Sequence, residues 1–541
     1  MIDALGPFYP LGVVPVFVNA GAALLPALVA GAASFFALLF RPRMLWAACR
    51  RNPRAAAIGL MTLLVLAAGG TWLMRAGAAP KPASPAAVEA GQRPPIDWTA
   101  RARQWIREGK TRPVAADPSS NQTTTMFGGG PNRSGCLGGD GPLGLVEAWQ
   151  FPAGSPLAEP LANAYFLSSP AVCGDAIFAA SCLNDFTGNY GTLVCLSAAP
   201  GKLRWFAKDY QAGGETRNCK GFFSSPAVTA DGKYLVIGQG LHDDSECDLL
   251  CFDARTGRLH WRVPTPLHLE SSPAIENDLV VVGAGSIEQG DDRRVDGHPG
   301  LVLAIEVSTG KKRWEFQLPD PESSPLLYEG VAYIGSGFNG NAVVALRTET
   351  DEQLRAEGKD RLMWRAATPH PATGPVTLAG DLVLVGCGNS DFVYGAKDPQ
   401  GAVIAIDRRS GKTRWTVPLP DSVLGKIAVR GNLAVVPVRN GEVVALDLAA
   451  DSPRIVWRQK INGGKAVLSG PALTESRVYA VSQDGRLAVL NASDGRVLES
   501  RQLNDPARPG DQGLSFSSPL IVNGRLYVGS ETGGLRCFAG K

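Results

Sequence analysis

The stretch Ser271-Ser-Pro-Ala-Ile275 (SSPAI) decides the fold, because its pattern recurs along the chain. Strong copies begin at four other serines, and three weaker copies, TGPVT, LGKIA and SGPAL, keep part of the pattern. In chain order the eight copies begin at Ser168, Ser224, Ser271, Ser323, Thr373, Leu424, Ser469 and Ser517. The copies are 45 to 56 residues apart, which indicates one structural unit repeated eight times.

Each unit contains the sequence signals of four short strands. The first is Ser-Ser-Pro with the apolar residues after it, and DLVVVGAG (278–285) and GLVLAIEV (300–307) are examples of the second and third. A turn such as STGK then leads to a fourth strand that carries a tryptophan, for example Trp314. Frequent turn signals between β-branched runs favour an antiparallel all-β fold. Four strands in each of eight units predict an eight-bladed β-propeller.

The ends of the repeat region predict how the ring closes. The last unit, which begins at Ser517, stops after its third strand, whereas the segment 147–151 with Trp149 has no earlier partner. We expect this N-terminal segment to supply the fourth strand of the eighth blade. Closure in this way would leave no unpaired sheet edge between the first and last blades.

These motifs carry a family resemblance. SSPAV together with LLCFDARTGRLHW (249–261) resembles the propeller repeat of the pyrroloquinoline-quinone (PQQ) type, and MFGGGPNRSG (126–135) is similar to segments that precede such repeats. The family includes quinoprotein alcohol dehydrogenases and outer-membrane assembly factors of the BamB type. The resemblance covers about 126–541 and implies that fourth-strand tryptophans stack on a glycine of a neighbouring blade. The residues concerned are Trp205, Trp261, Trp314 and Trp415, with Gly201, Gly257, Gly310 and Gly411.

The N-terminal region predicts a membrane anchor over residues 1–75. Residues 11–40 carry no charge, a second apolar run covers 55–74, and the loop 41–54 between them holds five arginines. The length of each run fits a transmembrane helix, and the arginines place the loop in the cytoplasm. The propeller would then lie on the periplasmic side of the inner membrane. An alternative is a signal peptide that is cleaved near Ala76–Ala78, which would also export the propeller.

Between the anchor and the propeller we expect two short segments. Residues 76–96 are a Pro/Ala linker, and residues 97–125 contain a short amphipathic helix and the lead-in to the repeats. The formal net charge is only +3, and no basic run is interleaved with aromatic residues, so nucleic acid is excluded as a partner. The expected partners are the membrane and a protein or another component of the cell envelope.

Candidate binding residues gather on one face of the predicted propeller. The loops 182–191, 240–247, 286–300 and 387–401 are long, whereas the equivalent loops of the last three blades are short. Long loops on a rigid scaffold commonly bind ligands. The candidates on this face are His242, His268, Glu270, His298, Glu322, His370 and Asp391.

Glu270 and Glu322 precede Ser-Ser-Pro in adjacent units, so both carboxylates should lie near the central channel. Two such carboxylates suit calcium, and with His268 they suit a transition metal. The alternative is that all three are ordinary polar residues at the edge of the repeat.

The resemblance also implies a cofactor, which the sequence supports weakly. Quinoprotein dehydrogenases bind PQQ and calcium, and they use a pair of adjacent cysteines with a Glu, Asn and Asp set. This chain has no adjacent cysteines and no segment that matches that set. We therefore assign no catalytic residue. The predicted function is a binding or assembly scaffold, and a PQQ-dependent oxidoreductase or a degenerate relative of one is the alternative.

The cysteines allow disulfides if the propeller is exported. Nine of the ten cysteines follow the predicted anchor, an odd number that leaves at least one without an intramolecular partner. Cys182 and Cys195 flank one predicted hairpin and are a candidate pair. Cys219 and Cys247 form the second candidate pair, near the top of the second blade.

Overall fold

The computed structural model describes residues 126–540 except 186–187, 243, 286–287, 290–293, 296–299, 450–451 and 509–512. The predicted anchor, the linker and the short helix lie outside these residues. In the part of the chain that the structure describes, no helix is both long enough and apolar enough to span a bilayer.

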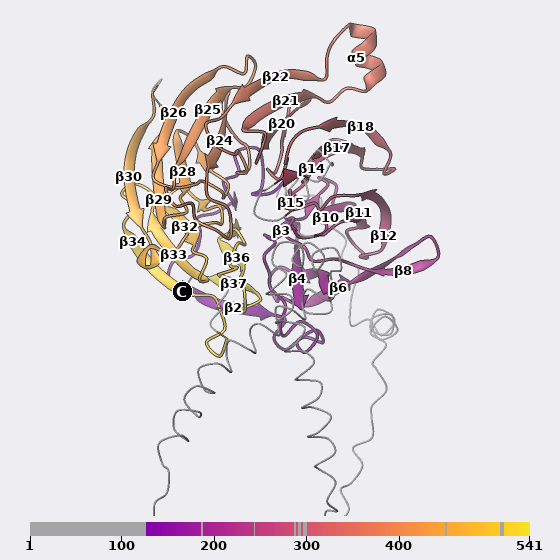
Figure 1. Ribbon diagram of the computed structural model, residues 1–541. Helices are drawn as coiled ribbons and strands as arrows, with labels where there is room; N and C mark the ends of the chain where they lie inside the picture. The colour runs from indigo at the N-terminus through magenta and orange to yellow at the C-terminus, as the bar shows by residue number, and fades with distance from the viewer. Residues whose placement is uncertain are drawn as a thin grey trace, which may run out of the picture. The chain divides into compact units, whose positions relative to one another are not determined.

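The described residues form an eight-bladed β-propeller, as the repeat predicts. Seven blades are four-stranded sheets, and the eighth has five strands. Figure 1 shows the blades following one another around an axis in chain order. Blade 1 consists of β3 (Ala171–Cys173), β4 (Ala176–Asp185), β5 (Gly188–Ser197) and β6 (Leu203–Ala207), and blade 2 of β9 (Ala227–Val228), β10 (Tyr234–Gly238), β11 (Cys247–Asp253) and β12 (Leu259–Thr265). Blade 3 consists of β13 (Ala274–Glu276), β14 (Leu279–Ala284), β17 (Leu301–Glu306) and β18 (Lys312–Gln317), and blade 4 of β19 (Leu326–Tyr328), β20 (Val331–Ser336), β21 (Ala342–Arg347) and β22 (Leu362–Ala367).

The second half of the ring follows the same order. Blade 5 consists of β23 (Thr377–Ala379), β24 (Leu382–Gly388), β25 (Gly401–Asp407) and β26 (Thr413–Leu419), and blade 6 of β27 (Ala428–Arg430), β28 (Leu433–Pro437), β29 (Glu442–Asp447) and β30 (Arg454–Lys460). Blade 7 consists of β31 (Ala472–Leu473), β32 (Arg477–Val481), β33 (Arg486–Asn491) and β34 (Val497–Gln502), and blade 8 of β1 (Cys136–Leu137), β35 (Leu520–Val522), β36 (Arg525–Gly529), β37 (Leu535–Ala539) and β2 (Val146–Phe151). The elements outside the blades are the hairpins β7 (Asp209–Ala212)–β8 (Glu215–Asn218) and β15 (Glu288–Gln289)–β16 (Arg294–Val295), the helix α5 (Asp351–Glu357) and the 3-10 turn η2 (Asn462–Gly464).

The ring closes as the sequence predicts. β2 pairs antiparallel with β37, from Val146 opposite Ala539 to Phe151 opposite Leu535. The two strands lie side by side in Figure 1, with the N-terminal β2 in purple and the C-terminal β37 in yellow. β1 adds a short parallel strand at the other edge of the same sheet. The eighth blade therefore contains both ends of the propeller.

The serines of the repeat motif join neighbouring blades around the axis. The backbone N–H of Ser225 donates to Oγ of Ser272 in the next blade at 2.9 Å, and the N–H of Ser272 donates to Oγ of Ser324 at 3.0 Å. The N–H of Ser518 donates to Oγ of Ser169 at 2.8 Å, which continues the series across the closure. These serines are almost fully buried. The Ser-Ser-Pro motif is thus explained by packing and hydrogen bonding between blades.

The tryptophans stack on glycines of the following blade. A Cβ added to Gly257 would lie 2.4 Å from the Trp205 ring, and one added to Gly310 would lie 2.7 Å from the Trp261 ring. The indole N–H of Trp205 also donates to the Ala254 carbonyl oxygen at 3.0 Å. All four glycines named by the resemblance lie against a tryptophan of the preceding blade, and for Gly201 and Gly411 the tryptophans are Trp149 and Trp364.

Two of the named tryptophans have other neighbours. The guanidinium carbon of Arg361 lies 4.5 Å from the centre of the Trp314 ring. Trp415 is half-buried and packs against an apolar cluster that includes Val403 and Val436. Neither ring meets a glycine of the next blade in the described residues.

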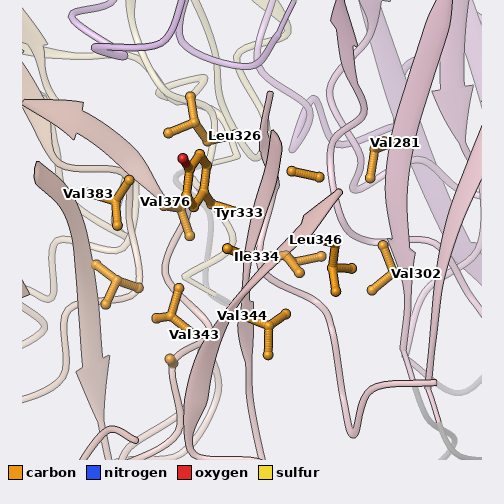
Figure 2. Packing of buried hydrophobic residues seen from close by; sticks show 14 of the residues in the cluster. Val281, Val302, Leu326, Tyr333, Ile334, Val343, Val344, Leu346, Val376 and Val383 are labelled. Carbon is orange, nitrogen blue, oxygen red and sulfur yellow. The ribbon is translucent and has the colours of Figure 1, made fainter. Parts of the chain in front are cut away.

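The core lies between successive sheets. Figure 2 shows one part of it, where Val281 and Val302 of blade 3, Val344 of blade 4 and Val383 of blade 5 lie in one buried cluster. Each strand alternates its side chains, so a blade packs one face on each neighbour. Both faces are buried, which explains why the middle strands are almost continuously apolar.

Residues 126–135, the segment that precedes the first repeat, cross the inner strands of four blades. Carbonyl oxygens of the segment accept hydrogen bonds of 2.7 to 3.0 Å from one inner-strand N–H in each of blades 5 to 8. The fully buried Arg133 donates from its side chain to the carbonyl oxygens of Val376 at 2.7 Å and Ser324 at 3.0 Å. The Lys426 ammonium donates to the Arg133 carbonyl oxygen at 3.0 Å and to that of Pro471. Residues 126–135 thus bring the buried Arg133 to the buried Lys426 of the sixth repeat copy, among the inner strands.

The structure corrects two expectations about the first blades. Residues 182–191 are not a long loop, because β4 and β5 stay paired as far as Asp185 and Gly188. The disulfide pairing of Cys182 with Cys195 is also wrong. Cys182 lies opposite Gly191, whereas Cys195 lies opposite Phe178, four positions further along the ladder.

The second candidate pair, Cys219 and Cys247, is also not bonded, and each of the nine cysteines that the structure describes has a free thiol. Burial raises the pKa of the Cys195 thiol to about 12 and raises that of Cys219 further. Thiols of this kind are poor nucleophiles and react slowly.

Candidate metal centre

Four of the predicted binding residues meet beside the axis. His242, His268, Glu270 and Glu322 each contribute one nitrogen or oxygen atom to a group in which all four atoms lie within 4.8 Å of one another. His268, Glu270 and Glu322 are the three residues predicted as metal ligands. His242 was predicted only as a binding residue of the same face, and it completes the group.

Glu322 lies at the centre of the hydrogen bonding. Its Oε1 is 2.9 Å from Nε2 of His268 and 3.1 Å from Nδ1 of His242. The two imidazole rings are 5.1 Å apart between centres, at an angle of 49°. His268 has no exposed surface, whereas the His242 side chain is 44% exposed. The site therefore has one buried wall and one side that solvent reaches.

Three successive blades supply the four residues. His268 and Glu270 precede β13 of blade 3, and Glu322 precedes β19 of blade 4. Because both glutamates stand immediately before Ser-Ser-Pro, the repeat brings them to equivalent places beside the axis. His242 comes from blade 2, in the loop between β10 and β11.

The loop that carries His242 has a defined conformation. The Asp244 carboxylate accepts the backbone N–H of Leu241 at 2.8 Å and the side-chain amide of Asn189. Gly240 has φ +99°, a conformation that favours glycine, and its N–H donates to the Gly221 carbonyl oxygen at 2.9 Å. These contacts tie the loop to Asn189 of β5 and to Gly221 in the segment before β9.

Gly285 leaves the room that the buried pair needs. A Cβ added at this position would lie 2.6 Å from Nε2 of His268 and 3.0 Å from Cγ of Glu322. Its backbone N–H donates to the His268 carbonyl oxygen at 3.1 Å. A larger residue would displace one of the two side chains.

The two glutamates have different acidities. Burial opposes ionisation of Glu322, but hydrogen bonds from His242 and His268 outweigh burial and hold its pKa well below the usual range. Burial, followed by the nearby charge of Glu322, raises the pKa of Glu270 to about 7. Glu322 is therefore ionised at neutral pH, whereas burial and the charge of Glu322 make Glu270 harder to ionise.

Among the residues that the structure describes, Nδ1 of His268 is buried and has no hydrogen-bond partner. Its other ring nitrogen, Nε2, bonds to Glu322. Leaving a buried polar atom unpaired is unfavourable, so packing alone gives no reason for a histidine here.

The other predicted binding residues lie elsewhere. His298 is outside the described residues. His370 is half-buried, and its backbone carbonyl accepts the Thr368 hydroxyl at 2.7 Å. Asp391 shapes its own turn, because its Oδ1 accepts the N–H groups of Val393 at 2.8 Å and Tyr394 at 2.5 Å. Neither His370 nor Asp391 belongs to the four-residue group.

An axial cavity adjoins the four-residue group. It contains about 590 Å³ of empty space, including space open to solvent, and Glu270 and Glu322 line part of its wall. Phe223, Phe392 and Phe516 line another part, with ring centres 5.6 to 5.7 Å apart. The cavity thus has an acidic side and an aromatic side.

The aromatic side was not predicted from the sequence. Phe223 and Phe516 stand immediately before Ser-Ser-Pro, the same repeat position as Glu270 and Glu322. Comparison of that one position in all eight units would have found both phenylalanines. Phe392 comes from the loop between β24 and β25, where no repeat position predicts it.

The cavity does not fit PQQ, the cofactor that the resemblance implies. PQQ is a tricarboxylic acid, and Glu270 and Glu322 would repel it. Both cations beside the axis, Arg133 and Lys426, already donate to backbone carbonyl oxygens. We therefore derive no oxidation step through this cofactor.

The fold and the comparison with known proteins define the class of protein to which this chain belongs. The fold is the eight-bladed propeller of PQQ-type repeats, a class that contains both binding proteins and dehydrogenases. The family model described as outer membrane protein assembly factor BamB matches residues 146–383 and 351–540, and the chain belongs to this family.

Relatives from both branches are similar to the chain. The outer membrane protein assembly factor BamB of Shewanella oneidensis is 24% identical over 413 residues, which cover 73% of this chain and 90% of that protein. The dehydrogenase subunit of a quinone alcohol dehydrogenase from Gluconobacter oxydans is 27% identical, over 42% of this chain and 30% of that protein. The crystal structure of quinohemoprotein alcohol dehydrogenase from Comamonas testosteroni matches with a TM-score of 0.51 and 14% identity, over 82% of this chain and 84% of that one, a likeness of fold alone.

Proposed function

We propose that this chain is an exported scaffold that binds a protein partner through the long-loop face of its propeller, held at the inner membrane by its N-terminal spans. Membership of the BamB family supports a protein partner. The apolar runs and the arginine-rich loop of the N-terminal region support export and anchoring.

The observation that carries the proposal is an ordered apolar loop tip between β24 and β25. Val393 is 68% exposed and Tyr394 is 71% exposed, the highest values among large apolar side chains in the described residues. Exposed aromatic and aliphatic side chains on a defined turn are characteristic of binding surfaces.

The tip is held in place before any partner binds. The Asp391 carboxylate accepts two backbone N–H groups of the turn, and Nε of Arg439 donates to the Asp391 carbonyl oxygen at 2.9 Å. Nη2 of Arg439 donates to the Val393 carbonyl oxygen at 3.4 Å. A preordered loop loses little conformational entropy on binding, which favours affinity.

Site-specific photo-crosslinking in intact cells tests the proposal. A photoreactive phenylalanine analogue replaces Tyr394 in the full-length chain, and the matched control carries it at Val497, which is 41% exposed on β34. We expect one discrete protein adduct from position 394 and none from position 497. No adduct at position 394, or the same adducts at both positions, would refute binding through this loop.

Export is tested separately. Protease added outside spheroplasts should digest the propeller of the full-length chain, whereas a cytoplasmic marker should survive. Survival of the propeller until the membrane is broken would contradict export without bearing on the loop surface.

The oxidoreductase alternative has its own assay. PQQ and calcium are added to the purified full-length chain, and dye reduction is followed with a panel of alcohols. We expect none, because the acidic cavity wall opposes binding of the cofactor. Dye reduction above that of the cofactor alone would favour the oxidoreductase instead.

A further inference from the structure

We propose that His242, His268, Glu270 and Glu322 bind one divalent transition-metal ion of the zinc type. The inference goes beyond the scaffold function and does not depend on it.

The distances among the ligand atoms suit such an ion. Zinc binds histidine nitrogen and carboxylate oxygen at about 2.0–2.2 Å, so tetrahedral ligand atoms lie roughly 3.4 Å apart. The two Glu322–histidine distances of 2.9 and 3.1 Å are slightly shorter, and the largest separation in the group is within 4.8 Å. Small side-chain movements would place all four atoms around one centre, and the ion would replace the two hydrogen bonds to Glu322.

The charges of the site favour a dication. Two carboxylates face each other, and neither forms an ion pair with a lysine or arginine among the described residues. Because like charges repel each other, ionisation of both carboxylates at this distance is unfavourable in a partly buried place. An ion of charge +2 between them would convert that repulsion into attraction.

The chemistry of the ligands selects the type of metal. Calcium prefers six to eight oxygen ligands, whereas imidazole nitrogen suits zinc, copper, iron and nickel. Two imidazoles and two carboxylates therefore favour a transition metal over the calcium that the two glutamates alone would suit.

The burial of His268 supports a metal ion independently of the distances among the ligand atoms. His268 has no exposed surface, and its Nδ1 has no partner among the described residues. A metal bond at Nε2 would leave Nδ1 unpaired, but it would give this buried ring a strong interaction at its other nitrogen, which packing alone does not supply. Gly285 also supports a metal at Nε2 of His268, because a glycine has no side chain that would fill the space beside this nitrogen.

The ion would connect three blades at the wall of the axial cavity. Its ligands come from the blade 2 loop and from the segments before the inner strands of blades 3 and 4. Binding to the folded state alone would raise the stability of this sector.

Metal uptake by the untagged full-length chain tests the proposal. The protein is stripped with a chelator, loaded with ZnCl2, desalted and analysed by elemental mass spectrometry, and affinity is measured by calorimetry. The variants are H242A, in an exposed loop, and E322Q, which keeps the shape of the side chain. The matched control is H370A, a histidine on the same face but outside the group.

We expect one zinc ion per chain in the wild type and in H370A. H242A and E322Q should bind at least ~10-fold more weakly, in line with the loss typical of disturbed metal sites. Zinc should raise the Tm of the wild type and of H370A, but not that of E322Q. Far-ultraviolet circular dichroism confirms that each variant is folded.

Two results would overturn the site. One is uptake well below one ion per chain at saturating zinc. The other is equal uptake by the wild type, H242A and E322Q, which would place the metal elsewhere. Neither result would affect the crosslinking test of the scaffold, because that test concerns a different loop.

Discussion

At the scale of the residue, one repeat position decides the character of the axial cavity. The residue before Ser-Ser-Pro is glutamate in blades 3 and 4 but phenylalanine in blades 2 and 8. The backbone at this position is held by the hydrogen bonds between blades, so the side chain is free to vary. A repeated scaffold with one variable position per blade thus builds an acidic wall beside an aromatic one.

Lys426 gives a prediction at this scale. Burial, together with the charge of Arg133, lowers the pKa of Lys426 to about 7, well below that of an exposed lysine. Between pH 7 and pH 10 the unfolded chain keeps a proton that the folded chain has lost, so this group makes the protein more stable as pH rises. We expect the free energy of unfolding of the wild type, minus that of K426M, to increase by up to about 1.4 kcal/mol per pH unit above pH 7.

Urea unfolding of both proteins from pH 7 to pH 9 measures this difference. K426M keeps an unbranched apolar stem of similar length and is the matched comparison. Using the difference removes the contribution of the buried cysteines, whose raised pKa values act in the opposite direction above pH 9. A difference that does not change with pH would show that Lys426 titrates normally.

At the scale of the element, a tryptophan–glycine contact at the outer strand joins neighbouring blades at five of the eight junctions, and serine hydrogen bonds join blades at the inner strand. The contact of Trp205 with Gly257 joins blades 1 and 2 at the outer strand, and the hydrogen bond from the Ser169 N–H to Ser225 Oγ joins the same two blades at the inner strand. Trp314 shows that the outer contact tolerates change, because Arg361 replaces the glycine there. Contacts at both edges help to stabilise the short strands of blades that are joined in this way.

A pair of glycine variants tests the outer contact. Gly257 has φ +68° and lies against Trp205, whereas Gly213 has φ +61° with no atom within 4 Å of an added Cβ. G257A and G213A share the backbone strain, so their difference isolates the steric clash. We expect G257A to be less stable by a further ~1–3 kcal/mol, the usual cost of overpacking. Chemical denaturation measures both, and equal losses would mean that the ring moves aside freely.

At the scale of the whole molecule, the propeller is closed by pairing of its two ends and not by disulfides. β2 and β37 meet in one blade, and all nine described cysteines are thiols. Eight of the nine are buried, and only Cys136 has intermediate exposure. A ring of this size buries enough apolar surface to fold without covalent cross-links.

Thiol labelling gives a prediction at this scale. Brief alkylation of the native full-length chain should modify Cys136 far faster than any of the eight buried cysteines. After denaturation without a reductant, all nine should be modified. Peptide mapping by mass spectrometry gives the extent at each site, and a Cys182–Cys195 or Cys219–Cys247 disulfide in the unreduced digest would contradict the free thiols.

Much of this fold could be predicted from the sequence, because the same pattern of strands and turns recurs in eight units. Ser-Ser-Pro, the apolar middle strands and the Gly-Trp turns identify the blades, and the incomplete last unit predicts the closure by β2. The meeting of Glu270 with Glu322 follows from the same repeat. Residues 182–191 were wrongly predicted as a loop because their polar composition hides a continued hairpin, in which hydrogen bonding between strands outweighs weak strand propensity.

The number of blades, their order and the equivalent places of the two glutamates follow from the amino-acid sequence alone, since periodic patterns specify strand faces and register. The tertiary structure was needed to show that His242 belongs to the group with His268 and both glutamates, whereas His370 and Asp391 do not. The path of a loop depends on contacts made after folding, here the Asp244 carboxylate and the left-handed Gly240. Such contacts join residues that are far apart in the chain, so no local sequence pattern predicts them.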